Sequence, residues 1–217
     1  MRFFRFLFAI GCLVALGGCG SEAGRARDIE VAGAAAFTED DARVITARLR
    51  DATERKLWEA EPTYSFVATA GGIKVRASAA PVDEDLRYLL SHRGEFVVRP
   101  ELGASWFEHR HIVDAQAAID ESGQALLRLR LSDEGRERLA RFSAKHVPAT
   151  VQVMFDRRQL TAARVSQPIT EGRIEVPVGS RSPKEVLLIA QILRTGALSF
   201  QPGAIQVSVS SKGGGGR

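Results

Sequence analysis

The segment Ala125-Leu-Leu-Arg-Leu-Arg-Leu-Ser-Asp-Glu134 changes from a strand pattern to a helix start. Its later leucines alternate with Arg128 and Arg130, which is the period of a strand with one buried face. Ser132, followed by two acidic residues, is typical of a helix N-terminus, because its hydroxyl can cap the first turn and acids are favoured there. A strand followed by a helix shows that the chain combines both types of element.

The first half of the chain repeats this mixture of periods. Its expected elements are a short strand Ile29–Val31, a helix from Thr38 to about Lys56, a hairpin of Tyr64–Thr69 and Ile73–Ser78, a helix opened by Pro81, and a strand Glu95–Arg99. The order β-α-β-β-α-β is that of a ferredoxin-like split unit. We therefore predict an α+β chain with a ferredoxin-like βαββαβ unit, followed by a second α+β subdomain.

The second half supplies that subdomain. Its expected strands are Ile112–Asp120, Ala125–Leu131, Thr150–Phe155, Leu160–Val165, Ile174–Val178 and Ile205–Ser210, with helices starting at Ser132 and Ser182. Turn residues separate the first two strands and also the next two. These two pairs are therefore expected to form hairpins.

The N-terminus has the layout of a cleaved secretion signal. Arg2 and Arg5 precede an uncharged, mostly apolar run over residues 6–16, which is too short to span a bilayer as a helix. Leu16-Gly-Gly-Cys19 then resembles the lipobox of bacterial lipoproteins, in which the cysteine is acylated. We predict a lipid anchor at Cys19. The alternative is an ordinary secretory signal with an incidental cysteine. Gly20 follows the cysteine at the position where an aspartate would resemble an inner-membrane retention signal, so this resemblance implies the outer membrane over the inner membrane.

Composition restricts the classes of function. The chain has 217 residues, 45% of them hydrophobic and 26% charged, which fits a folded domain and excludes a disordered chain. The formal net charge is +4, with basic and acidic residues interspersed, so no nucleic-acid partner is expected. There are two cysteines, Cys12 and Cys19. The mature domain is therefore expected to have neither a disulfide nor a thiol nucleophile.

One short cluster could hold a metal ion. His109, His111 and Asp114 lie close in sequence, and on a strand the two histidines would share a face. Zinc sites normally need three or four protein ligands, and no clear further ligand follows. We expect a polar strand entry there, with no metal, no cofactor and no catalytic residues in the chain.

Five segments, in the same order, resemble the first periplasmic domain of the SecD protein-export family. They are Leu86 to Arg99, His111-Ile-Val-Asp-Ala to Gln124, Leu129-Arg-Leu-Ser-Asp-Glu-Gly135, Val153 to Ile169 and Leu187 to Leu198. The resemblance covers about residues 29–210 and is most specific from His111 to Leu198. It implies a base unit and a head subdomain. SecD also carries transmembrane helices, whereas here we expect only a cleaved leader.

The resemblance also implies an organisation and a function. The expected parts are a signal peptide at 1–18, a tether at 19–28, a base-like subdomain at 29–104, a head-like subdomain at 105–198, a returning strand at 199–211 and a flexible tail at 212–217. The expected function is a lipid-anchored periplasmic domain that binds polypeptide and assists export or envelope assembly, without catalysis. The alternative is a docking subunit of an envelope or secretion complex unrelated to Sec translocation.

Overall fold

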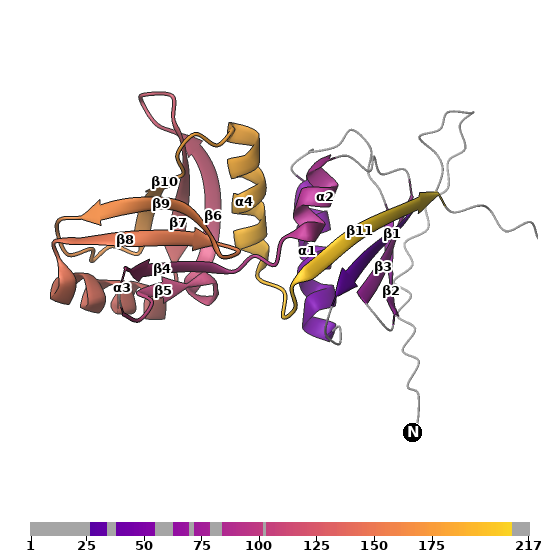
Figure 1. Cartoon of the computed structure of the whole chain (residues 1–217), viewed down its shortest axis with the longest axis horizontal. Helices are drawn as coiled ribbons and strands as arrows, with labels where there is room; N and C mark the ends of the chain where they lie inside the picture. Colours follow the sequence, from indigo (N-terminus) through magenta and orange to yellow (C-terminus); the bar gives the residue numbers. More distant parts are fainter. Residues whose placement is uncertain are drawn as a thin grey trace, which may run out of the picture.

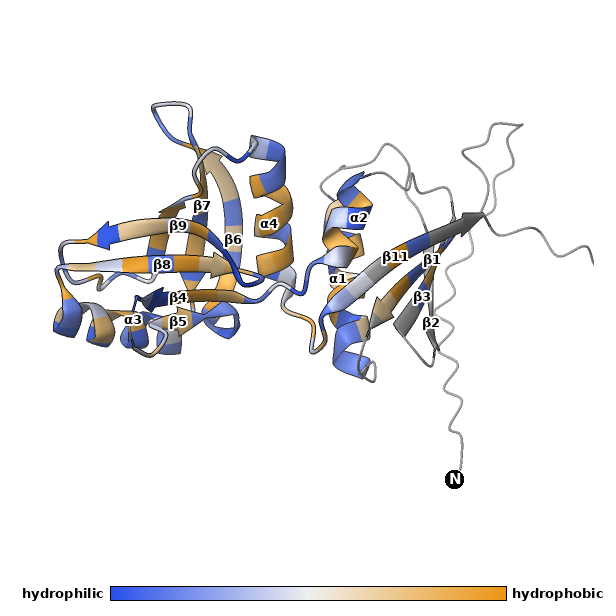
Figure 2. Cartoon of the chain, viewed as in Figure 1, coloured by the Kyte–Doolittle hydropathy of each residue, from blue (hydrophilic) through white to orange (hydrophobic). Residues whose placement is uncertain are grey.

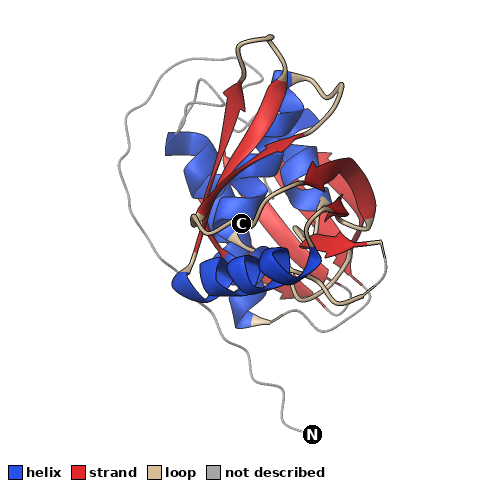
Figure 3. Ribbon diagram, turned by 90° about the vertical axis from the view of Figure 1, so that its left-hand side faces the viewer, coloured by secondary structure: helices blue, strands red, loops and turns tan. Residues whose placement is uncertain are grey.

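The computed structural model describes residues 27–33, 38–54, 63–69, 72–78, 84–101 and 103–209. These residues form two units arranged along the long axis of the molecule, a base and a head, with one helix between them (Figure 1). A view from the head end shows the strands and helices of both units stacked behind one another (Figure 3). The predicted α+β fold, with a ferredoxin-like base followed by a second α+β subdomain, is confirmed.

The base is a four-stranded antiparallel sheet with two helices on one face. Its elements are β1 (Arg27–Gly33), α1 (Glu39–Glu54), β2 (Thr63–Thr69), β3 (Gly72–Ser78), α2 (Glu84–Ser91) and β11 (Pro202–Val209). The strand order is β11-β1-β3-β2, as in a ferredoxin-like unit. Ile29, Val31 and Val75 are fully buried in a core shared with Ile45 and Leu49 of α1, so the alternation along the strands accounts for the face that the helices cover.

The head contains two sheets and two helices. Its elements are β4 (Phe96–Pro100), β5 (Phe107–Glu108), a 3-10 turn η2 (His109–His111), β6 (Ile112–Ile119), β7 (Ala125–Leu131), α3 (Asp133–His146), β8 (Ala149–Phe155), β9 (Arg158–Val165), β10 (Arg173–Pro177) and α4 (Pro183–Thr195). One sheet has the order β10-β7-β6 and the other β5-β4-β8-β9. The expected hairpins are β6–β7 and β8–β9. As predicted, Ser132 caps α3 by accepting the backbone N–H of Gly135.

One strand assignment made from the sequence is wrong. The strand predicted at Glu95–Arg99 to complete the base is β4, which pairs with β8 in the head. The place beside β1 is taken by β11, the strand predicted to return near the C-terminus. The physical reason is the buried face of β4: Phe96 and Val98 pair with Phe155 and Val153 and share one core with them. Alternation identifies a strand but does not specify its partner.

The helix α4 connects the two units. It packs on β6 of the head and on α1 and α2 of the base. Figure 2 shows α4 coloured as hydrophobic along most of its length, whereas α3 alternates. From residue 186 to residue 193, all but one of the side chains of α4 are buried. This fits its sequence, because a helix that is apolar on nearly all sides needs neighbours on nearly all sides. The head is therefore held against the base over a packed surface. Within the described ranges, no helix is long and apolar enough to cross a bilayer.

Candidate functional site

The head encloses an apolar cavity between its two sheets, which we call the head cavity. Its volume is about 70 Å³. The lining includes Trp106, Leu139 of α3, Val153 of β8, Ala163 of β9 and Ile174 of β10. These residues come from segments far apart in sequence, brought together because each strand turns its apolar face inward. A space of this size accommodates one small aliphatic side chain.

The cavity lies where the two sheets of the head fail to join. Strand β9 is the outer strand of one sheet and β10 is the outer strand of the other. The two strands are close in space, but within the described residues no ladder of hydrogen bonds connects them. Two outer strands with an apolar interior between them form a site where an extended chain can add along an edge and insert a side chain.

The segment that joins β9 to β10 is fixed to the rest of the head at two points. The buried Ser143 of α3 accepts the backbone N–H of Ile169 through its hydroxyl at 2.9 Å. The carbonyl oxygen of Gly172 accepts the backbone N–H of Leu131 at 2.7 Å. Ile169 is half-buried and also lines the head cavity. This loop therefore forms one rim of the cavity.

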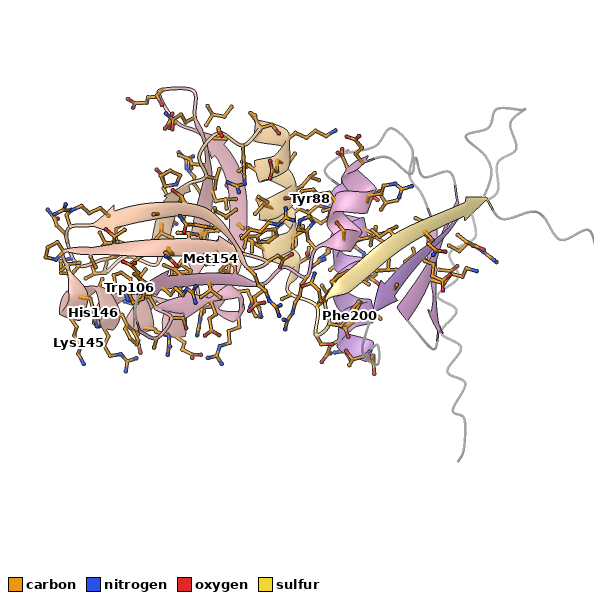
Figure 4. The ribbon with its side chains drawn as sticks, in the orientation of Figure 1. Tyr88, Trp106, Lys145, His146, Met154 and Phe200 are labelled. Atoms are coloured by element: carbon orange, nitrogen blue, oxygen red, sulfur yellow. The ribbon has the colours of Figure 1, made fainter. Side chains whose placement is uncertain are left out.

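Trp106 supplies a polar group to this apolar lining. Its side chain is fully buried, and its indole nitrogen Nε1 has no hydrogen-bond partner among the described residues. An unsatisfied buried donor is unfavourable, and buried polar groups are nearly always paired. The indole N–H is thus an unsatisfied buried donor at a residue that lines the cavity. Trp106 lies near His146, the last residue of α3, with their ring centroids 6.2 Å apart. Both residues are labelled in Figure 4.

The cluster that could have held a metal does not assemble. His109 and His111 lie in the 3-10 turn η2 instead of on a strand, so they do not share a strand face. His111 is buried, and its Nδ1 accepts the backbone N–H of Glu108. The carboxylate of Asp114 accepts the N–H of Ala115. In the described part of the chain, no group of three or more histidine, cysteine, aspartate or glutamate residues could hold a metal ion.

The ionisable groups near this turn have shifted pKa values. Burial lowers the pKa of the His109 imidazole, and a hydrogen bond from Ser105 lowers the pKa of the Glu108 carboxyl. His109 Nδ1 is buried without a partner among the described residues. These shifts follow from burial and a local hydrogen bond.

The predicted lipidation residue, Cys19, lies outside the described residues. The signal peptide and the tether are outside them as well, apart from the last two residues of the tether, which belong to β1. The structure therefore leaves the lipid anchor as a prediction.

Sequence reasoning did not single out the residues of the head cavity. Trp106 is the second residue of the predicted head-like subdomain at 105–198, and its signal in the sequence is a large aromatic residue directly after Gly103-Ala-Ser105. The backbone N–H of Trp106 donates to the carbonyl oxygen of Val98 at 2.7 Å. This hydrogen bond holds Trp106 beside β4, where its indole is buried.

The comparisons with known proteins agree with the geometry. Residues 94–200 match the model of the SecDF P1 head subdomain. Protein translocase subunit SecD of Acidaminococcus fermentans is 35% identical over 89 residues, which are 41% of this chain and 21% of that protein. Protein translocase subunit SecD of Dictyoglomus turgidum is 29% identical over 100 residues, which are 46% of this chain and 25% of that protein. The chain thus spans about a quarter of the length of these relatives or less.

Two solved structures share the fold. A crystal structure of SecDF in Super-membrane-facing form superimposes with a TM-score of 0.70 and 20% identity, covering 85% of this chain and 30% of that chain. A structure of SecDF, described as a membrane component that enhances protein export, superimposes with a TM-score of 0.64 and 19% identity, covering 85% of this chain and 98% of that one. The resemblance to the SecD first periplasmic domain, stated from sequence segments, is confirmed.

Proposed function

Residues 94–200 of this chain form a SecDF P1 head subdomain, and from this premise we propose that the chain binds extended segments of exported polypeptide and assists protein export. The client strand adds along the edge of β9 or β10. One of its aliphatic side chains enters the head cavity. The observation that carries the proposal is this cavity between two unjoined sheet edges.

The proposed binding is non-catalytic. The matched relatives are translocase subunits, and the head cavity is lined almost entirely by apolar side chains. Such a site recognises shape and backbone, which suits clients of many sequences. The alternative, a docking subunit unrelated to Sec translocation, is less favoured because the matches are to SecD itself.

The proposed location is the periplasmic face of a membrane, with a lipid anchor at Cys19. The lipobox-like Leu16-Gly-Gly-Cys19 supports the anchor, and Gly20 supports the outer membrane. The structural similarity to SecDF, a membrane component that enhances protein export, favours the inner membrane instead. Sucrose-gradient fractionation of the native chain and of Cys19→Ala decides both points. Release of the variant into the soluble periplasm is the expected result, and equal membrane retention of both would contradict the anchor.

The cavity is tested by filling it. Ala163 is half-buried on β9 and lines the cavity, so Ala163→Leu adds three carbon atoms into a space of about 70 Å³. Ala162→Leu is the matched control, because the same change falls on the exposed, opposite side of β9. The measurement is fluorescence anisotropy of a labelled, unfolded, valine-rich peptide titrated with the purified chain.

The expected result is saturable binding by the native chain and by Ala162→Leu, with binding by Ala163→Leu weakened at least about tenfold. Loss of one buried aliphatic side chain from an interface corresponds to about 1.5–3 kcal/mol, which is tenfold or more. Absence of saturable binding by the native chain would overturn the proposed function. Unchanged binding by Ala163→Leu would place the peptide elsewhere.

Client binding in cells can be mapped with a photoreactive residue at Gln167, which is exposed in the loop that rims the cavity. A spread of secretory chains cross-linked together with Sec components is the expected result. One dominant envelope protein would support the docking alternative. Phe107, an otherwise natural choice, is almost fully buried and lines the cavity, so Gln167 is the better position.

A further inference from the structure

A second hollow lies on the face of β4 and β8 that points away from the head cavity. It has a volume of about 160 Å³ and is lined by Glu95, Val97, Arg99, Met154 and Arg157. Val97 of β4 pairs directly with Met154 of β8, so these two side chains form its apolar floor. Their neighbours Val98 and Val153 face the other way, into the head cavity. Met154 is labelled in Figure 4. We call this site the charged hollow.

Two arginines flank the floor without neutralising partners. Arg99 is exposed on β4, and Arg157 is exposed in the turn between β8 and β9. Within the residues that the structure describes, neither guanidinium forms a hydrogen bond or an ion pair. Glu95, the acidic residue of the lining, is already paired with Arg93 at 3.3 Å. The charged hollow therefore carries unsatisfied positive charge above an apolar surface.

Arg157 occupies a backbone conformation that favours glycine. Its φ angle is +65°, and that of the preceding Asp156 is +46°. The strain at Asp156 has a structural reason, because its Oδ1 accepts the backbone N–H groups of Gly94 and Glu95 at 2.9 and 2.8 Å. Arg157 has no such contact, and its side chain lines the hollow. The two residues form the turn between β8 and β9, and the favoured two-residue hairpin turn requires a positive φ at both positions.

From this arrangement we propose that the charged hollow binds an acidic side chain of the client polypeptide, a glutamate or aspartate that lies next to apolar residues. The inference rests on the proposed function and adds a second contact to it. Guanidinium groups match a carboxylate with paired hydrogen bonds. The methylene groups of the client glutamate lie on Val97 and Met154, and the flexible Met154 side chain adapts to different neighbours. The client segment that carries this side chain lies over the same face of β4 and β8 as the hollow, and continues from the segment that adds along the sheet edge.

The test uses three labelled peptides of the same valine-rich sequence, with glutamate, glutamine or lysine at one exposed position. Anisotropy titrations are made with the whole chain at low salt and at 0.5 M salt. The glutamate peptide is expected to bind about three- to fivefold more tightly than the glutamine peptide at low salt, because exposed ion pairs contribute on this scale. The preference is expected to disappear at 0.5 M salt, where charges on a surface are screened.

The decisive variant is Arg157→Gly. It removes the charge and also relieves the backbone strain, so it is expected to abolish the preference for glutamate while raising the urea midpoint of unfolding. Arg158→Gln is the matched control: it removes one positive charge at the next residue, which does not line the hollow. It is expected to keep the preference.

The outcomes separate the two proposals. Tight binding of all three peptides with equal affinity would overturn this inference and leave the proposed function standing. Equal loss of preference in Arg157→Gly and Arg158→Gln would also overturn it, because overall charge would then be responsible. Binding to anionic vesicles in place of any glutamate preference would assign the arginines to a membrane surface. Absence of binding to every peptide would overturn both proposals.

Discussion

Arg48 is the charged residue most deeply involved in the core. It is fully buried in α1, and its guanidinium donates to the carbonyl oxygens of Leu89, His92, Arg93 and Gly196 at 2.5–2.9 Å. These carbonyls lie at the ends of α2 and α4, where the helix dipoles attract positive charge. Burial lowers the pKa of the guanidinium to about 10, so it remains charged at neutral pH. One side chain thus connects the base to the helix α4 of the head.

Arg48→Met is expected to lower the free energy of unfolding by about 3 kcal/mol, because it leaves several buried carbonyls without a donor. Urea titration followed by circular dichroism measures the change. Arg43→Met is the matched control on the same helix. Arg43 is 69% exposed and, among the described residues, pairs with Glu39 and Asp40, so its loss is expected to leave the urea midpoint nearly unchanged. Equal effects of the two changes would contradict the role assigned to Arg48.

The start of α1 gives a prediction at the scale of the element. Thr38 and Asp41 cap this helix reciprocally, because each side chain accepts the other residue's backbone N–H. Asp41 also accepts the backbone N–H and the hydroxyl of Ser199, in the segment that leads to β11. Burial opposes ionisation of Asp41, but these hydrogen bonds from Thr38 and Ser199 outweigh it and lower the pKa of the carboxyl.

Asp41→Asn is therefore expected to lose stability in a pH-dependent way. A carboxyl whose pKa is lower in the folded state stabilises the fold above its unfolded pKa of about 3.8, and this contribution disappears as the pH falls through the folded value. At pH 7 we expect the variant to be about 2 kcal/mol less stable, with the difference shrinking below pH 4. Urea midpoints from pH 7 to pH 2.5 measure this. Asp40→Asn, at an 84% exposed position of the same turn, is the control, and a difference independent of pH would contradict the explanation.

The sequence predicts the helices and strands more readily than it predicts which elements pack or pair with one another. The helix starts at Thr38 and Ser182 were predictable because capping depends on residues within one turn. The partner of β4 was not, because Phe96 and Val98 would fit a core in either unit. Arg48 falls between Ile45 and Leu49 on the buried face of α1, yet a charged residue predicts exposure, and its four carbonyl partners come from distant segments. The head cavity was not predictable for the same reason, since five strands and α3 contribute residues to its lining.

At the scale of the whole molecule, the head and base share a polar junction as well as an apolar one. Arg194 of α4 donates to Asp51 of α1 and to the carbonyl oxygen of Ala115 in β6. Gln191, also buried in α4, donates to the carbonyl oxygen of Arg48 at 2.8 Å. If one unit unfolded alone, these polar groups of the other unit would lose their hydrogen-bond partners. Separate unfolding of the two units is therefore costly.

The base and head are therefore expected to unfold as one cooperative body. Hydrogen exchange in low urea measures this, because the slowest amides report the free energy of global opening. Amides of β1 and β3 in the base and of β7 and β8 in the head are expected to share one opening free energy, and Arg48→Met is expected to lower all of them by the same amount. If Arg48→Met lowered only the base amides, the units would unfold independently, and α4 would belong to the head alone. A common decrease in both units would instead mean that the orientation of the head cavity relative to the base is fixed by the same interactions that stabilise the fold.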